Sequence, residues 1–113
     1  MEESILLTIK KLLGISDDDT AFDEDVAVHI NTVIMAMRQF GIGPDHFSIT
    51  GDTETWSNLL GNSYNGDLEA VKTYLYLRVK KVFDPTGSSI VAEAMNQTIS
   101  ELEWRLNSEV DFN

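Results

Sequence analysis

The sequence predicts an all-α fold: a single small bundle of about five helices over residues 1–113, with a Gly/Pro-rich loop and at most one short strand pair. Three observations support this prediction. Apolar residues recur at helical spacing in every long segment, and the alternation typical of a strand occurs only at Phe47 and Ile49. A chain of 113 residues is also about one domain, which buries roughly two-thirds of its unfolded surface.

The first predicted helix is short, and Gly14 ends it because glycine readily takes the positive φ of a helix end. The acidic run SDDDTAFDED follows at 16–25. A calcium loop needs alternating acids, a glycine at its sixth position and a glutamate at its twelfth, whereas Ala21 and Phe22 stand where the turn would continue. We therefore expect no metal site here and interpret the acids as caps that also complement the dipole at the N-terminus of the next helix. The apolar positions of the first helix are Ile5, Ile9, Leu12 and Leu13.

The second predicted helix runs from Phe22 to Phe40 and stops at Gly41. Val28 and Met35 lie on its reverse face, so the helix is apolar on two sides, and we expect it to be pure core at the centre of the bundle. His29 and His46 have no second ligand at metal spacing and are interpreted as structural residues. The main stripe consists of Phe22, Val26, Ile30, Val33, Met37 and Phe40.

A loop rich in Gly, Pro and Asp follows at 41–53, and it lacks the lysine and the serine or threonine of a phosphate-binding loop. Within it, Phe47 and Ile49 predict one short strand. Residues 54–60 predict a brief helix with Trp56, capped by Thr53, and GNSYNG at 61–66 is a turn. These short elements connect the long helices.

The fourth predicted helix is capped by Asp67 and ends at Asp84 and Pro85, because the residue before proline disfavours helical geometry. Ala70, Tyr74 and Leu77 fall on the side opposite its core stripe. Tyr74 and Leu77 are therefore candidate members of an interface with another subunit or a partner protein. The core stripe consists of Leu68, Val71, Leu75, Val79, Val82 and Phe83.

The fifth predicted helix runs from about Ile90 to Leu106 after a cap at Ser88 or Ser89, and Trp104 points away from its core stripe. Two interpretations of Trp104 stay open: an intersubunit contact, or cover by the first helix or the C-terminal tail of the same chain. The tail at 107–113 is either a flexible end or an extended docking peptide. Expected core positions are Val91, Ala94, Met95, Thr98, Ile99, Leu102 and Leu106, and the apolar tail residues, also candidate interface members, are Val110 and Phe112.

Composition excludes several classes of protein. A formal charge of −11, with eleven acids and three bases in the first 66 residues, leaves no basic stripe for nucleic acid. Three interpretations of that charge stay open: solubility, a surface past which DNA slides, or a surface that imitates DNA. With no cysteine, no signal peptide and no membrane span, we expect a soluble protein made in the cytoplasm, without cofactor or metal.

The chain resembles the head-tail connector, or portal adaptor, proteins of long-tailed double-stranded DNA phages and prophages. The residues that carry the resemblance are VKTYLYLRVKKVFDP, the turn TGSS and the ending ISELEWRLN. The earlier part agrees, with a short helix ending LLGI, then FDEDVAVHINTVIMAMRQFGIGP and a short helix around Trp56. The resemblance covers nearly the whole chain in the same order.

The resemblance implies a structural virion protein of a bacterial phage, not an enzyme. It implies a ring, dodecameric in the virion, that docks below the portal protein, closes the head after DNA packaging and joins it to a tail-side connector or tail-completion protein. The genome passes through without specific binding, and no membrane is involved. Ring contacts join two different patches of the subunit, which suits the extra apolar positions on the helices.

Two other classes remain open on the residues alone. An acidic DNA-mimic or other partner-binding inhibitor would share the charge, but the run at 16–25 is too local for an extended imitation of phosphates. An enzyme is disfavoured, because the two histidines have no nucleophile placed with them by a recognisable motif.

Overall fold

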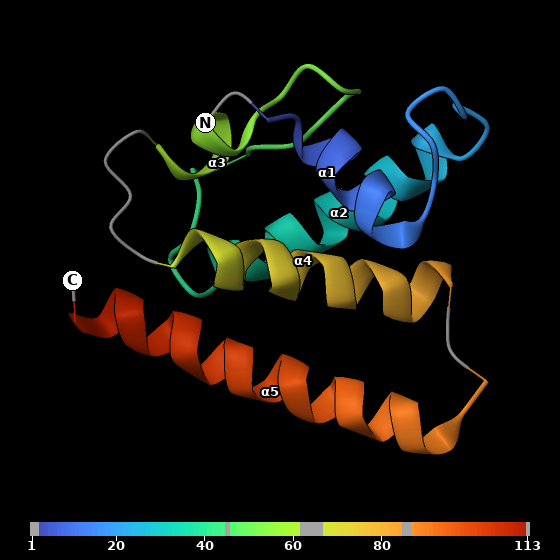
Figure 1. Ribbon diagram of the computed structural model, residues 1–113. Helices are drawn as coiled ribbons and strands as arrows, with labels where there is room; N and C mark the ends of the chain where they lie inside the picture. Colours follow the sequence, from blue (N-terminus) through green and yellow to red (C-terminus); the bar gives the residue numbers. More distant parts are fainter. Residues whose placement is uncertain (1–2, 45, 62–66, 85–86, 113) are drawn as a thin grey trace.

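Five helices form the structure in the computed structural model, which describes residues 3–44, 46–61, 67–84 and 87–112. Side chains are described as far as residue 107. The predicted all-α class is confirmed, and the described residues contain one isolated antiparallel bridge, between Ser4 and Thr55, and no sheet. The helices are α1 (Ile5–Leu13), α2 (Asp23–Arg38), α3 (Trp56–Leu60), α4 (Leu68–Phe83) and α5 (Ser89–Phe112) (Figure 1).

Helix α4 lies at the centre of the bundle. It packs against α1 and α2, and α5 runs along its other side (Figure 1). The expectation that α2 is central and pure core is therefore wrong. Only one face of α2 is covered, so Val28 and Met35 on the reverse face are 57% and 61% exposed.

The position of α4 also changes which of its residues are buried. Because other helices cover two of its sides, Ala70 and Tyr74 are buried together with the predicted stripe residues Val71, Leu75 and Val79. The direction expected for Tyr74 is thus wrong, since its side chain lies inside the subunit. Several predicted core positions are exposed, namely Phe22, Val82, Val91, Ala94 and Thr98.

Helix α1 ends as predicted, because Gly14 adopts φ 84° and its N–H donates to the last turn. Helix α1 also contains a buried charge, Lys10, whose burial costs free energy unless the charge has a partner. Lys10 is only 1% exposed, and its Nζ lies 2.7 Å from Oδ1 of Asp23 in the first turn of α2. The acidic run thus supplies a partner for a buried ammonium. The predicted side-chain cap is absent, since Phe22 occupies the N-cap of α2 without a cap hydrogen bond. The acids do complement the helix dipole as predicted, because Asp23, Glu24 and Asp25 stand in the first turn.

Caps define the remaining helix starts. The N-cap of α3 is Thr55 instead of the expected Thr53, and it forms a reciprocal capping box with Asn58. Asp67 caps α4 as predicted, accepting a hydrogen bond from the N–H of Ala70 at 3.1 Å. At α5, Ser88 accepts from the N–H of Val91 at 3.3 Å.

The predicted strand at Phe47 and Ile49 is absent from the structure. Ile49 is buried as the alternation indicated, but a side chain takes the place of a partner strand. The Asn31 Oδ1 accepts from the N–H of Ile49 at 2.7 Å, and the Asn31 Nδ2 donates to the Ile49 carbonyl at 3.0 Å. This pair of bonds fastens the loop to α2.

The Lys10–Asp23 pair leads to a test of stability. Asp23→Asn should lower the free energy of unfolding by about 2 kcal/mol, because it leaves a buried ammonium without its carboxylate, and the partial exposure of Asp23 limits the loss. The double variant Lys10→Met/Asp23→Asn should recover most of that loss. Urea denaturation measures both, with Glu24→Gln on the exposed first turn of α2 as the control. Equal losses in Asp23→Asn and Glu24→Gln would contradict this role for the pair.

Candidate interaction surfaces

The contact between α4 and α5 decides which side of α5 faces solvent. The Tyr74 hydroxyl donates to the Glu103 carboxylate at 2.8 Å and accepts from Nη1 of Arg78 at 2.7 Å. Arg78 also pairs with Glu103 at 3.3 Å. Burial, together with the hydrogen bond to Glu103, raises the pKa of Tyr74 to about 12. A polar network therefore joins the two helices beside their apolar contacts.

A second polar contact fixes α5 two residues further along the helix. Nη2 of Arg105 lies 2.8 Å from Oδ2 of Asp67, the residue that caps α4. On either side of these two polar contacts along α5, Ile99 and Leu106 are buried. These bonds set the rotation of α5 about its axis, so its opposite side must point away from the bundle.

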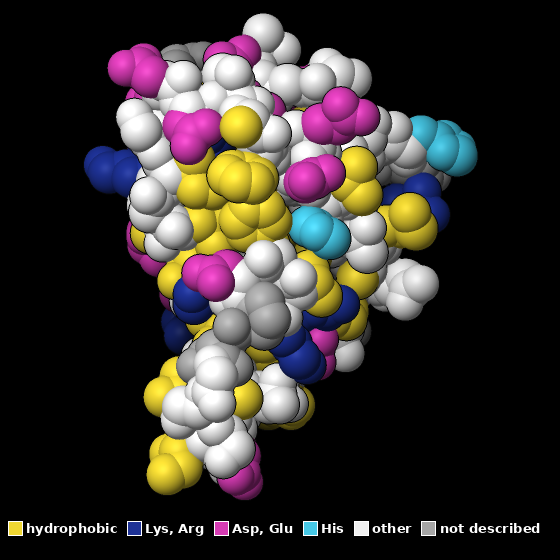
Figure 2. All heavy atoms as spheres, turned by 90° about the vertical axis from the view of Figure 1, so that its right-hand side faces the viewer, with side chains coloured by type: hydrophobic (Ala, Val, Ile, Leu, Met, Phe, Trp, Pro, Cys, Tyr) yellow, Lys and Arg dark blue, Asp and Glu magenta, His cyan; other side chains and the backbone are white. Residues whose placement is uncertain are grey.

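We call that opposite side the outer α5 face. Its two large apolar side chains are among the most exposed in the structure: Ile90 is 81% exposed and Trp104 is 73% exposed. The beginning of α5 projects from the body of the molecule (Figure 2). At helical spacing, the residues on this face are Ile90, Ala94, Gln97, Glu101 and Trp104, all of them exposed.

A second apolar surface lies where α4 ends near the start of α2, and we call it the end patch. The rings of Phe22 and Phe83 pack edge to face with their centroids 5.7 Å apart, and the centroids of the His29 and Phe83 rings are 6.4 Å apart. Leu12 and Val82 at the adjoining helix ends are also exposed. Figure 2 shows apolar side chains gathered on this side of the molecule with carboxylates around them.

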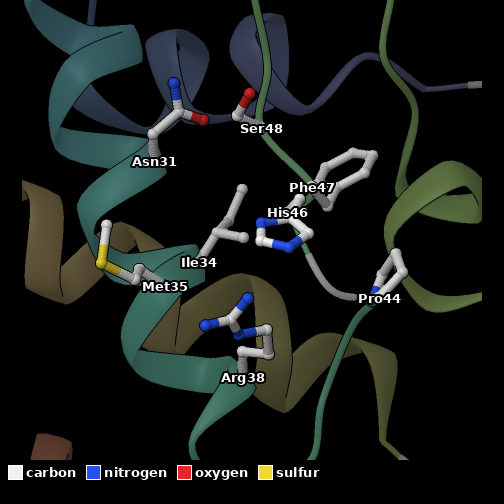
Figure 3. Close-up of a pocket in the computed structure, with 8 residues that line it drawn as sticks. All are labelled: Asn31, Ile34, Met35, Arg38, Pro44, His46, Phe47 and Ser48. Atoms are coloured by element: carbon white, nitrogen blue, oxygen red, sulfur yellow. The ribbon is translucent and has the colours of Figure 1, made fainter.

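The third surface is a groove of about 400 Å³ between α2 and the following loop, which we call the α2 groove. Arg38 reaches up from α2 toward the His46 imidazole and Ile34, while Met35 lies at one side (Figure 3). Apolar and cationic groups therefore share one depression. Its lining residues are Asn31, Ile34, Met35, Arg38, Pro44, His46, Phe47 and Ser48.

Local backbone geometry shapes the α2 groove. His46 adopts φ 63°, a left-handed conformation that side-chain-bearing residues rarely take, and it is the one such residue among those described that is not glycine. Gly43 adopts φ 90°, and a Cβ there would lie 2.9 Å from Leu59. The Asn31 bonds to Ile49 then hold the far end of the loop on α2. Sequence patterns missed this groove, because a side-chain-to-backbone clamp across 18 residues has no periodic signature.

The predicted interface residues do not form one surface, because they differ in exposure. Trp104 is exposed, so the interpretation that α1 or the tail covers it within one chain is wrong. Leu77 is half-buried against the core, and Tyr74 is buried. The side chains of Val110 and Phe112 lie outside the described residues, although the α5 backbone is helical through Phe112 instead of extended.

Neither a metal centre nor a membrane-spanning helix is found among the described residues. Within the described part of the chain, no group of three or more His, Cys, Asp or Glu residues is placed to hold a metal ion. Among the same residues, no helix combines the length and apolar character needed to cross a membrane. The surfaces that stand out are apolar and suited to macromolecular contact.

Comparison with known proteins agrees with such a role. The model of the family described as phage connector protein matches residues 5–113, and the chain belongs to that family. The family is one of structural phage proteins, not of enzymes. No curated protein and no solved structure matches the chain.

The Tyr74 network predicts a pH dependence. The folded-state pKa of about 12 exceeds the ordinary value of 10.0, so the folded state holds the phenol proton more tightly. The stability gained from this group is present below pH 10 and should be lost as pH rises through 12. Spectroscopic titration of tyrosinate should show one late-ionising group that disappears in Tyr74→Phe. If the group lost in Tyr74→Phe ionised near the ordinary pKa of 10.0, the assignment would be contradicted.

Proposed function

We propose that copies of this connector form a ring, dodecameric in the virion, that docks below the portal. The ring closes the head after DNA packaging and joins it to a tail-side connector or tail-completion protein. One observation carries the proposal: a 73% exposed tryptophan on the outer face of a helix whose other side is fixed to the bundle. Tryptophan is enriched at the energetic centres of protein interfaces.

The charge of the chain supports the accompanying role of the ring as a DNA channel. With −11 on each subunit, phosphates passing close to the ring meet repulsion and not a basic stripe. DNA mimicry, the alternative use of such charge, is less well supported. The acidic run at 16–25 is too short to imitate a row of phosphates, and one of its carboxylates, that of Asp23, is paired with Lys10.

Trp104→Ala tests the assembly role. The substitution should weaken ring formation with portal assemblies by roughly 2 kcal/mol or more at each contact, since interface tryptophans contribute energy of that order. Thermal stability of the isolated subunit should change little, because Trp104 is exposed there. Co-sedimentation with portal rings and thermal unfolding measure the two effects. Asn96→Ala, on an exposed flank of the same helix, is the matched control. A destabilised subunit that still assembles normally would contradict the role of Trp104.

The channel role predicts that the purified protein does not retain duplex DNA at physiological salt. Any repulsion it exerts should weaken as the Debye length falls from about 10 Å at 0.1 M salt to about 3 Å at 1 M. Electrophoretic mobility and fluorescence anisotropy with labelled duplex measure the affinity. Binding of duplex DNA with submicromolar affinity at physiological salt would contradict the channel role.

A further inference from the structure

We propose that Trp104 and Glu101 of one copy dock into the α2 groove of the neighbouring copy, with Glu101 facing Arg38 and His46. The inference rests on the proposed ring and specifies which two surfaces of the subunit meet in it. Both surfaces are exposed in the single chain, and they come from different helices.

The α2 groove has the size and chemistry to receive an aromatic side chain. Its volume of about 400 Å³ falls in the range of roughly 300–1,000 Å³ found for binding pockets. Met35 and Phe47 provide apolar walls, and methionine adapts its shape to an aromatic ring. An inserted tryptophan would remove about 150–250 Å² of its surface from water, which strongly favours docking.

Charge selects an acidic occupant for this groove. The chain carries −11, yet the groove brings together Arg38 and His46. Glu101 stands three residues before Trp104, one helical turn away on the same face. Arg105, which also lies beside Trp104, is paired with Asp67 of its own chain. Glu101 is the residue of this group that carries a carboxylate, and we expect it to face Arg38. The Arg38 guanidinium can also stack on the indole ring.

The end patch is a poorer receptor for the same face. The first turn of α2, beside the patch, carries Asp23, Glu24 and Asp25. Figure 2 shows both carboxylates and basic side chains around the apolar side chains there, and Lys80 and Lys81 stand in the last turn of α4. Charge around the end patch is therefore mixed, whereas the α2 groove combines a guanidinium with a depression of about 400 Å³ that an indole can enter.

The position of the two surfaces also fits a ring. Helix α4 packs between α2 and α5, so the outer α5 face and the α2 groove lie on different sides of the subunit. A contact between two different patches is heterologous and repeats from copy to copy, whereas two copies of one patch form a closed dimer. Two complementary patches on one chain are what a ring of identical subunits requires.

Disulfide cross-linking tests the contact directly. The chain contains no cysteine, so Ser48→Cys in the α2 groove and Ser100→Cys beside Trp104 introduce the thiols without a background. In portal-bound rings under mild oxidation, the double variant should give a ladder of covalent multimers extending beyond the dimer. Each single variant should stay monomeric on the same gel. The control pair Ser48→Cys/Thr98→Cys, whose second thiol lies on the side of α5 roughly opposite Ser100, should give no ladder.

A charge exchange tests the predicted polar contact. Arg38→Glu and Glu101→Arg should each weaken ring assembly at least tenfold, and the double exchange should restore most of it. Glu93→Arg, on the same helix, should not rescue Arg38→Glu. Circular dichroism of each variant separates loss of assembly from loss of folding, and rescue by the double exchange cannot arise from misfolding.

The outcomes separate this inference from the proposed function. Rings that form normally without the Ser48–Ser100 ladder and without charge rescue would overturn the docking inference and leave the connector ring intact. Wild-type protein that forms no ring with portal assemblies would overturn the proposed function and, with it, the inference. A covalent dimer from Ser100→Cys alone would show a symmetric contact and also overturn the inference.

Discussion

The burial of α4 on two sides is the constraint on which the rest of the structure depends. Because α1 and α2 cover one side and α5 covers another, this single helix connects all the long elements of the bundle. Tyr74 shows the consequence most clearly. Its ring is fully buried and contacts Phe40, while its hydroxyl joins α4 to Glu103 of α5. A helix in this position needs apolar residues around much of its circumference and polar groups only where they find partners.

The packing of α5 follows from that constraint and connects the fold to the function. Helix α5 is the longest in the structure, and the side that faces α4 is held by apolar contacts and by polar contacts at Tyr74 and Asp67. Once that side is fixed, the orientation of the other side is fixed too. An exposed side chain on a rigid helix loses little conformational entropy on binding, so Trp104 is well placed to contribute to assembly.

Buried charge is confined to places where it has a partner. Lys10 lies in the core between α1 and α2, and it is matched with Asp23 from an otherwise solvent-facing acidic run. The remaining acids are mostly exposed, which leaves the surface strongly negative. Against that background, the α2 groove places the Arg38 guanidinium beside apolar walls, which is the charge that the inferred contact brings to Glu101 of a second copy.

The sequence by itself determined the helical class, the order of the helices, most of their ends and the outward direction of Trp104. Each of these depends on local information: the 3.6-residue period, capping residues such as Asp67 and the positive φ at Gly14. Only the tertiary structure decided which helix is central, and therefore that Tyr74 is buried while Val28 and Met35 are exposed. Periodicity reports that a side is apolar, but the helix that covers it comes from elsewhere in the chain. The α2 groove needed the tertiary structure for the same reason, because the bonds between Asn31 and Ile49 join residues far apart in sequence.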